Sequence, residues 1–170
     1  MVEAIIFVIF PLCLALAALT DFFEMTIPNR IPAILAAAFL LVAPFTGMAI
    51  EVIGLHVAAA SMVFAAGFVL FAINAMGGGD AKLLAAASIW FGLDPSLFTF
   101  MLYVAYLGGG LTLLILVIRA NSEVVTAFGV RLPDSIVTAN KIPYGIAIGA
   151  AGLMTFPQSP PVVWALAQMS

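Results

Sequence analysis

The sequence predicts an all-α membrane protein, a polytopic helical bundle of about six transmembrane helices with both termini outside. Hydrophobic residues occupy 65% of the 170 positions, charged residues 8%, and the mean hydropathy is +1.28. Soluble domains are about 45–50% apolar and about 25% charged. A soluble fold of this composition would have too few charged residues to shield its apolar surface from water. The apolar stretches are also too long for the alternating strands of a membrane barrel. We expect a single membrane-embedded domain over residues 1–170.

The charged residues divide the chain into six apolar stretches, which we take as the helices: Met1–Thr20, Ile31–Ile50, Val52–Met76, Leu83–Leu93, Pro95–Ile118 and Ile142–Ser170. Five of them reach the roughly 20 residues that a transmembrane helix needs, and Leu83–Leu93 is short. The first stretch lacks the positive n-region of a signal peptide, so we expect a retained helix. Prolines interrupt the last stretch, which we expect to end near Phe156 and leave a short interfacial tail.

The basic residues indicate the topology. With six helices all five of them fall on one side, as the positive-inside rule requires, namely Arg30, Lys82, Arg119, Arg131 and Lys141. With five helices, Lys82 and the Arg119–Lys141 loop would fall on opposite sides. We therefore place 21–30, 75–82 and 119–141 inside, and Glu51 and Asp94 in outer turns.

The composition also excludes several kinds of site and partner. Five Lys and Arg in the whole chain argue against nucleic acid as a partner. The single Cys13 excludes an intramolecular disulfide and a Cys-rich zinc site. No cluster of ligating residues suggests a metal, and no cofactor is expected. The bilayer itself is an expected partner, while the oligomeric state stays open.

Asp80 stands out because it opens the short fourth helix after Gly77, Gly78 and Gly79. A helix from Asp80 to Asp94 would measure about 22 Å, against about 30 Å of hydrocarbon, which places Asp80 below the inner membrane boundary. Non-helical backbone at that depth, here the glycines, is tolerated only within protein or beside a water-filled cavity. A carboxylate there is costly and indicates a function.

Asp21 follows the first apolar run on the same inner side. Two carboxylates facing each other in a cleft of low dielectric cannot easily both ionise, so such a pair holds a shared proton near neutral pH. That state provides a base to activate water and an acid to polarise a peptide carbonyl, as in an aspartic protease. Glycines before Asp80 would let an extended substrate backbone approach closely, because they carry no Cβ.

Plainer interpretations exist for each of these residues. Asp80 is suited to cap the fourth helix, and the glycines then form only a turn. Asp21 as a lone carboxylate would be a solvated residue beside the membrane. Glu24, three residues further on, could replace Asp21 in the pair or simply be solvated.

The remaining polar residues also have structural interpretations. Lys82 would be an interfacial anchor whose side chain extends to the headgroups. His56 would be a hydrogen-bonded packing residue near the outer end of the third helix. Pro28 and Asn29 read as a turn, with Asn29 as a cap of the second helix. The triplet Gly108-Gly109-Gly110 lies within a helix and suggests close helix packing.

Two motifs at these residues resemble the type IV prepilin peptidase family. The first is Asp21-x5-Ile27-Pro28-Asn29, directly after a transmembrane helix, and the second is Gly77-Gly78-Gly79-Asp80-Ala81-Lys82-Leu83-Leu84. The segment Lys141-Ile142-Pro143-Tyr144-Gly145 is similar to the family's late Pro-containing segment. With one cysteine, the chain resembles the short form found with Flp/Tad pilus systems.

The resemblance implies an aspartic endopeptidase of the bacterial inner membrane that removes the basic leader of a prepilin or pseudopilin precursor at the cytoplasmic face. It implies catalytic roles for Asp21 and Asp80. The residues that would shape the site or the substrate's approach are Gly77, Gly78, Gly79, Pro28, Asn29 and Lys82. Long family members carry an additional four-cysteine region and methylate the new N-terminus. This chain has no room for that region, so methyltransferase activity is not expected.

Two other classes of function compete with the peptidase. A small ion- or proton-coupled transporter would use the intramembrane Asp80 to bind a proton or cation. Transporters often show internal repeats with broken helices in both halves, and none is evident here. A non-catalytic membrane scaffold of a pilus or secretion machine would tolerate loss of either carboxylate.

Overall fold

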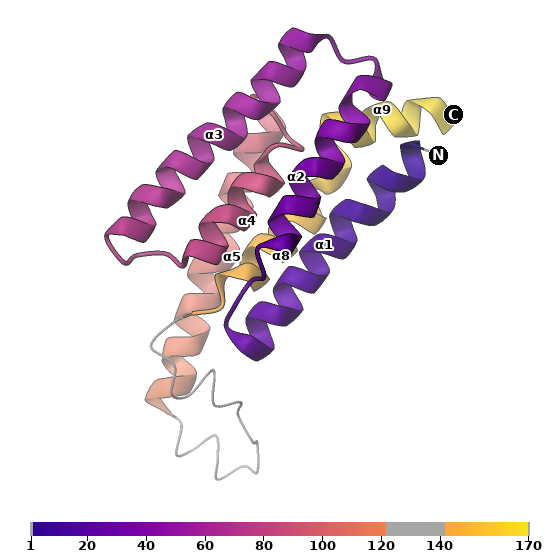
Figure 1. The fold of residues 1–170 in the computed structure, drawn as a ribbon. Helices are drawn as coiled ribbons and strands as arrows, with labels where there is room; N and C mark the ends of the chain where they lie inside the picture. The colour runs from indigo at the N-terminus through magenta and orange to yellow at the C-terminus, as the bar shows by residue number, and fades with distance from the viewer. Residues whose placement is uncertain (1, 122–141, 170) are drawn as a thin grey trace.

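The computed structural model describes residues 2–121 and 142–169 as a bundle of helices (Figure 1). In chain order the elements are α1 (Val2–Glu24), α2 (Arg30–Val42), η1 (Ala43–Thr46), α3 (Ile50–Ala72), α4 (Gly78–Ser88), α5 (Pro95–Ala120), α8 (Tyr144–Thr155), η2 (Phe156–Gln158) and α9 (Pro160–Met169). The described residues contain no strand, which confirms the all-α prediction for this part of the chain. The start of α1 and the end of α9 lie at the same end of the bundle.

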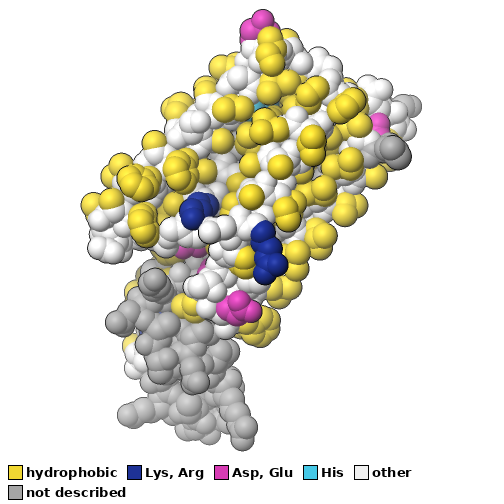
Figure 2. Space-filling view, in the orientation of Figure 1, with side chains coloured by type: hydrophobic (Ala, Val, Ile, Leu, Met, Phe, Trp, Pro, Cys, Tyr) yellow, Lys and Arg dark blue, Asp and Glu magenta, His cyan; other side chains and the backbone are white. Residues whose placement is uncertain are grey.

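Among the described helices, α1, α3 and α5 are long and apolar enough to cross a membrane. Their 23, 23 and 26 residues correspond to about 34–39 Å of helix, enough for about 30 Å of hydrocarbon. Hydrophobic side chains are spread over the visible face of the described helices (Figure 2), whereas Arg30 and Lys82 lie near the starts of α2 and α4. The structure thus has a surface that suits lipid, with three candidate spans. The count of six spans stays a prediction.

Helices run alternately toward and away from one end of the bundle, which we call the cleft end. The end of α1, the start of α2, the end of α3, and the starts of α4 and α8 all contribute residues to one cavity there. Neighbouring helices α3 and α4 pack side by side, as do α1 and α8. This alternation brings segments far apart in the sequence to a single site.

The fourth helix is shorter than the sequence suggested, because α4 ends at Ser88 rather than continuing to Asp94. Its 11 residues give only about 16 Å of helix. A turn follows, with Gly92 in the left-handed region at φ +67°, and it places Trp90 and Phe91 fully inside the protein. The left-handed backbone of Gly92 cannot continue an α-helix, so the chain leaves the helical path here.

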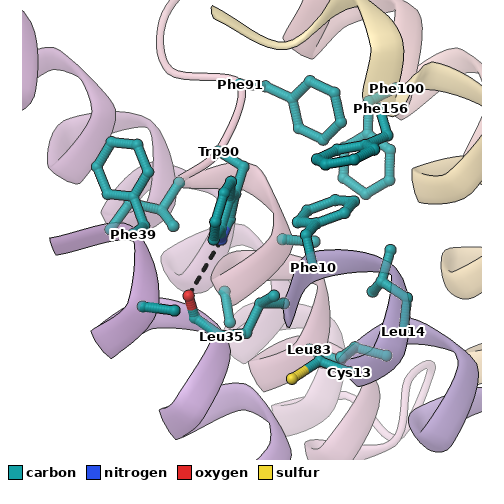
Figure 3. Close-up of a cluster of buried hydrophobic side chains, with 14 of the residues drawn as sticks. Phe10, Cys13, Leu14, Leu35, Phe39, Leu83, Trp90, Phe91, Phe100 and Phe156 are labelled. Atoms are coloured by element: carbon teal, nitrogen blue, oxygen red, sulfur yellow. Dashed lines mark hydrogen bonds between the residues drawn. The ribbon is translucent and has the colours of Figure 1, made fainter. Parts of the chain in front are cut away.

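Aromatic rings from five of the described segments, α1, α2, the turn after α4, α5 and η2, form a closed core away from the cavity, at what we call the aromatic end (Figure 3). Phe10 of α1 stacks on Phe156 of η2 with ring centroids 4.5 Å apart, and lies 5.2 Å from the Trp90 ring. The indole Nε1 of Trp90 donates a hydrogen bond of 3.0 Å to the backbone carbonyl of Leu35 in α2. Phe91 stacks on Phe100 of α5 at 4.7 Å.

Two smaller predictions can be compared with the fold. His56 is buried, its ring Nδ1 lies 2.6 Å from the carbonyl oxygen of Ile89, and its ring stacks on Phe39 at 4.8 Å, which confirms the packing role. The last apolar stretch does break near Phe156, since α8 ends at Thr155. The residues after the break form the helix α9, which buries one face against the bundle.

Candidate functional site

A cavity of about 580 Å³ opens at the cleft end, and Asp21 and Asp80 both line it. Its other walls come from the turn after α1, the end of α3, the glycines before α4 and the start of α8: Met25, Thr26, Ile27, Asn29, Phe71, Asn74, Ala75, Met76, Gly77, Gly78, Gly79, Ile142 and Tyr144. Residues from the two sequence motifs therefore meet in one place, although they lie about sixty positions apart.

Asp21 lies in the last turn of α1 and is only 5% exposed. Its Oδ2 accepts a hydrogen bond of 2.7 Å from the backbone N–H of Gly145, in the first turn of α8. The amino end of a helix carries free N–H groups and a partial positive charge, both of which favour an anion. The interpretation of Asp21 as a solvated carboxylate is therefore wrong. Glu24, by contrast, is exposed and does not line the cavity.

Gly145 is a site residue whose contact the sequence did not reveal. A Cβ at this position would lie 2.8 Å from Asp21 Oδ2, 2.9 Å from Asp21 Cβ and 3.0 Å from Ile27 Cδ1. Only a glycine lets the backbone come this close without a shift of the neighbouring atoms. The resemblance pointed to the segment that contains Gly145, but a contact across 124 positions has no local signal.

Asp80 is buried at 7% exposure and is the third residue of α4. The N-cap of α4 is Gly77, so the interpretation of Asp80 as the capping residue is wrong. The Asp80 carboxyl group folds back over this cap, since a Cβ on Gly77 would lie 2.6 Å from Asp80 Oδ2. Asp80 thus lies at the amino end of its own helix, and the Asp21 carboxyl group contacts the amino end of α8; negative charge is favoured at both ends.

The glycines before Asp80 differ from the expected non-helical run. Only Gly77 is extended, whereas Gly78 and Gly79 form the first turn of α4. A Cβ on Gly79 would lie 3.2 Å from the Cβ of Ile27, and one on Gly78 would lie 3.3 Å from the ring of Phe71. These glycines therefore let α4 begin close against its neighbours, and all three still face the cavity.

A hydrogen bond joins the two sequence motifs beside the cavity. The Lys82 Nζ donates to Asn29 Oδ1 at 2.8 Å, so Lys82 has a specific partner beyond its role at the surface. Asn29 occupies the N-cap position of α2, as predicted, but it has helical backbone angles and its side chain makes no capping hydrogen bond. The predicted turn is present, with the Ile31 N–H donating to the Pro28 carbonyl at 3.0 Å.

A second hollow, which we call the lateral groove, runs between α2, α3 and α4 and measures about 550 Å³. Most of its walls are small or apolar side chains, with Asn29, Ser61 and Lys82 as the polar ones: Asn29, Pro32, Ala33, Ala36, Val57, Ala60, Ser61, Phe64, Lys82, Ala85, Ala86 and Ile89. Asn29 borders both the groove and the cavity, so the two hollows adjoin at the Asn29–Lys82 hydrogen bond.

Chemically, the cavity offers two carboxyl groups beside a space that admits water. Two carboxyl groups that come within hydrogen-bonding distance of each other can share a proton, activate water and polarise a carbonyl. Within the described ranges there is no group of three or more His, Cys, Asp and Glu arranged to hold a metal ion.

Comparison with known families gives one match. Residues 8–116 match the model of the type IV leader peptidase family, a range that includes both motifs and both aspartates. The comparisons with curated proteins and with solved structures found no match.

Proposed function

Since this chain belongs to the type IV leader peptidase family, we propose that it is a membrane aspartic endopeptidase that cleaves the leader from prepilin or pseudopilin precursors. The observation that carries this proposal is the shared cavity of Asp21 and Asp80. Two buried carboxyl groups are costly to maintain next to a water-accessible space unless they act there. Glu24, exposed and outside the cavity, is no alternative partner.

In the proposed reaction, the ionised member of the pair takes a proton from a water molecule in the cavity. The resulting oxygen nucleophile attacks the peptide carbonyl, which the protonated member polarises. A C–O bond forms, the C–N bond breaks, and the proton passes to the leaving amine. The Gly145 N–H bond to Asp21 holds one carboxylate in place throughout.

We place the cavity at the cytoplasmic face of the inner membrane. Arg30 opens α2, Lys82 lies in the first turns of α4 and Arg119 lies in the last turn of α5, all toward the cleft end. Clustered basic residues favour the cytoplasmic side. Arg131 and Lys141, which belong to the same argument, lie outside the described residues.

The test of this orientation is cysteine-accessibility labelling in intact cells. Glu51→Cys at the start of α3 and Asn121→Cys after α5 are expected to label from opposite sides of the membrane. Labelling of both from the same side would contradict the proposed topology.

We propose that the apolar helix of the precursor enters sideways along the lateral groove. The walls of the groove are mostly small and apolar side chains, which suits packing against an apolar helix, and the groove adjoins the cavity at Asn29. A precursor with its helix is expected to be cleaved far better than a soluble peptide of the same cleavage sequence. Equal cleavage of the two substrates would contradict lateral entry.

An Asp21→Asn variant distinguishes a peptidase from a transporter and from a scaffold. In membranes with a pilin-like precursor, the wild type is expected to release leader peptide and the variant none. A scaffold would support pilus assembly in both cases without cleavage, and a transporter would show ion flux without cleavage. Cleavage by Asp21→Asn would contradict the proposed function.

A further inference from the structure

The side chain of Tyr144 links α5 to the start of α8 beside the cavity. Its hydroxyl oxygen lies 3.0 Å from Thr112 Oγ1, and Thr112 Oγ1 donates to the carbonyl of Gly108 at 2.7 Å. A threonine hydroxyl has one hydrogen, which is used here on Gly108, so the Tyr144 hydroxyl is the donor to Thr112. The Tyr144 hydroxyl hydrogen is therefore directed to α5.

The glycine triplet of α5 explains how the Tyr144 ring packs against the same helix. Gly108 is buried, and a Cβ there would lie 2.9 Å and 3.2 Å from two ring carbons of Tyr144. Gly109 and Gly110 are exposed, with no neighbouring atom within 4 Å of such a Cβ. Only Gly108 thus provides the close packing that the sequence suggested for the triplet.

Tyr144 is also the residue immediately before Gly145, whose N–H binds Asp21. A trans peptide fixes adjacent Cα atoms about 3.8 Å apart, so a shift of Tyr144 moves the Gly145 N–H with it. The Tyr144 N–H itself bonds the carbonyl of Ile142 at 2.9 Å. The contacts of Tyr144 with Thr112 and Gly108 of α5, which we call the anchor, therefore help to position the amino end of α8 against Asp21.

We propose that Tyr144, anchored by Thr112 and Gly108, is a positioning residue that holds the Gly145 N–H on Asp21 and so keeps that carboxylate directed into the cavity. The inference rests on the proposed peptidase function. Misplacement of a catalytic group by about 1 Å can cost about 100-fold in rate, so even a partial release of this anchor affects turnover.

The test uses Thr112→Val, which is close in shape but removes the acceptor of the Tyr144 hydroxyl, and Tyr144→Phe, which removes the donor. Each purified full-length variant is reconstituted in lipid and assayed with a pilin-like precursor. We expect kcat to fall about tenfold with KM and the unfolding temperature unchanged. Thr112→Ser, which keeps the hydroxyl, is expected to restore kcat. Gly108→Ala is expected to reduce kcat as well, while the matched Gly109→Ala is not.

The variant Asp21→Asn, measured in the same assay, distinguishes a failure of the positioning role of Tyr144 from a failure of the proposed peptidase function. If Asp21→Asn is inactive but Thr112→Val and Tyr144→Phe keep the wild-type kcat, the positioning role is overturned and the peptidase stands. A parallel change of kcat, KM and unfolding temperature without rescue by Thr112→Ser would likewise overturn it, because the anchor would then be merely structural. An active Asp21→Asn would remove the proposed function and this inference together.

Discussion

Along α1, α4 and α8 the bundle changes from the open polar cavity at the cleft end to the closed core of the aromatic end within about three helical turns. Asp21 and Phe10 lie on α1, and Gly145 lies in the first turn of α8, the helix that leads to Phe156. At the cleft end, glycines and a backbone N–H hold two carboxyl groups beside 580 Å³ of space. At the aromatic end, the rings are buried and pack against one another, with Phe10 stacked on Phe156.

The difference indicates that the two ends of the same helices have different roles, activity at the cleft end and stability at the aromatic end. Buried carboxyl groups and cavities lower stability, whereas packed rings and a satisfied indole N–H raise it. We therefore expect substitutions at the cleft end to reduce activity while the fold persists. Substitutions at the aromatic end should reduce stability while each folded molecule retains its activity.

The largest expected effect concerns the two aspartates as one unit. Asp21→Asn and Asp80→Asn are each expected to reduce kcat by about a thousandfold or more, and the double variant by little more than either. Residues that share one proton fail together, so their losses do not add. Product formation by all three variants in lipid checks this. Additive losses would show that the aspartates act independently.

The next effect lies at the aromatic end. Trp90→Ala removes a fully buried ring and leaves the Leu35 carbonyl without the indole donor, so we expect a loss of about 3–5 kcal/mol in the free energy of unfolding. Activity per folded molecule should stay near that of the wild type. Tyr106→Ala, at an 86% exposed ring, is the control and should change stability little. If Trp90→Ala lost much of its kcat without a loss of stability, the separate roles of the cleft end and the aromatic end would be contradicted.

A smaller effect is expected in the lateral groove. Ala33 is exposed on α2 and lines the groove, so Ala33→Phe narrows the groove without disturbing the core. We expect KM for a helix-containing precursor to rise about tenfold with kcat unchanged. Ala37→Phe, one turn further along the same helix and outside the groove, is the matched control. Equal KM values for the two variants would count against lateral entry.

The smallest effect is expected at Glu24. This carboxylate is exposed and does not face the cavity, so Glu24→Gln should leave activity within about twofold of the wild type, as for most surface substitutions. Steady-state cleavage of the same precursor measures it. A loss of activity as large as that of Asp21→Asn would indicate that Glu24 has a catalytic role, which contradicts the assignment.

The sequence could predict the helical fold and the two aspartates, because apolar length and short motifs are local signals. It could not predict that α4 ends at Ser88, since the left-handed turn at Gly92 and the burial of Trp90 that accompany this end depend on tertiary packing. Nor could it show that Gly78 and Gly79 are helical, because their packing against Phe71 and Ile27 is a tertiary contact.

The hydrogen bond from Gly145 to Asp21 was hidden for a similar reason. Its two partners lie 124 positions apart, and the intervening 122–141 segment falls outside the described residues. From the sequence alone, a glycine in an apolar helix indicates only close helix packing. Its role as a donor to a carboxylate depends on how α8 lies against α1, which no local pattern encodes.

The most direct test of the account is a paired measurement on purified Asp80→Asn in lipid, namely precursor cleavage and thermal unfolding on the same sample. Asparagine is nearly the same size as aspartate, and Asp80 is not the N-cap of α4, so the fold should persist. We predict cleavage below about a thousandth of the wild-type rate with an unchanged unfolding temperature. Wild-type cleavage by Asp80→Asn would contradict the account and reduce Asp80 to a structural residue of α4.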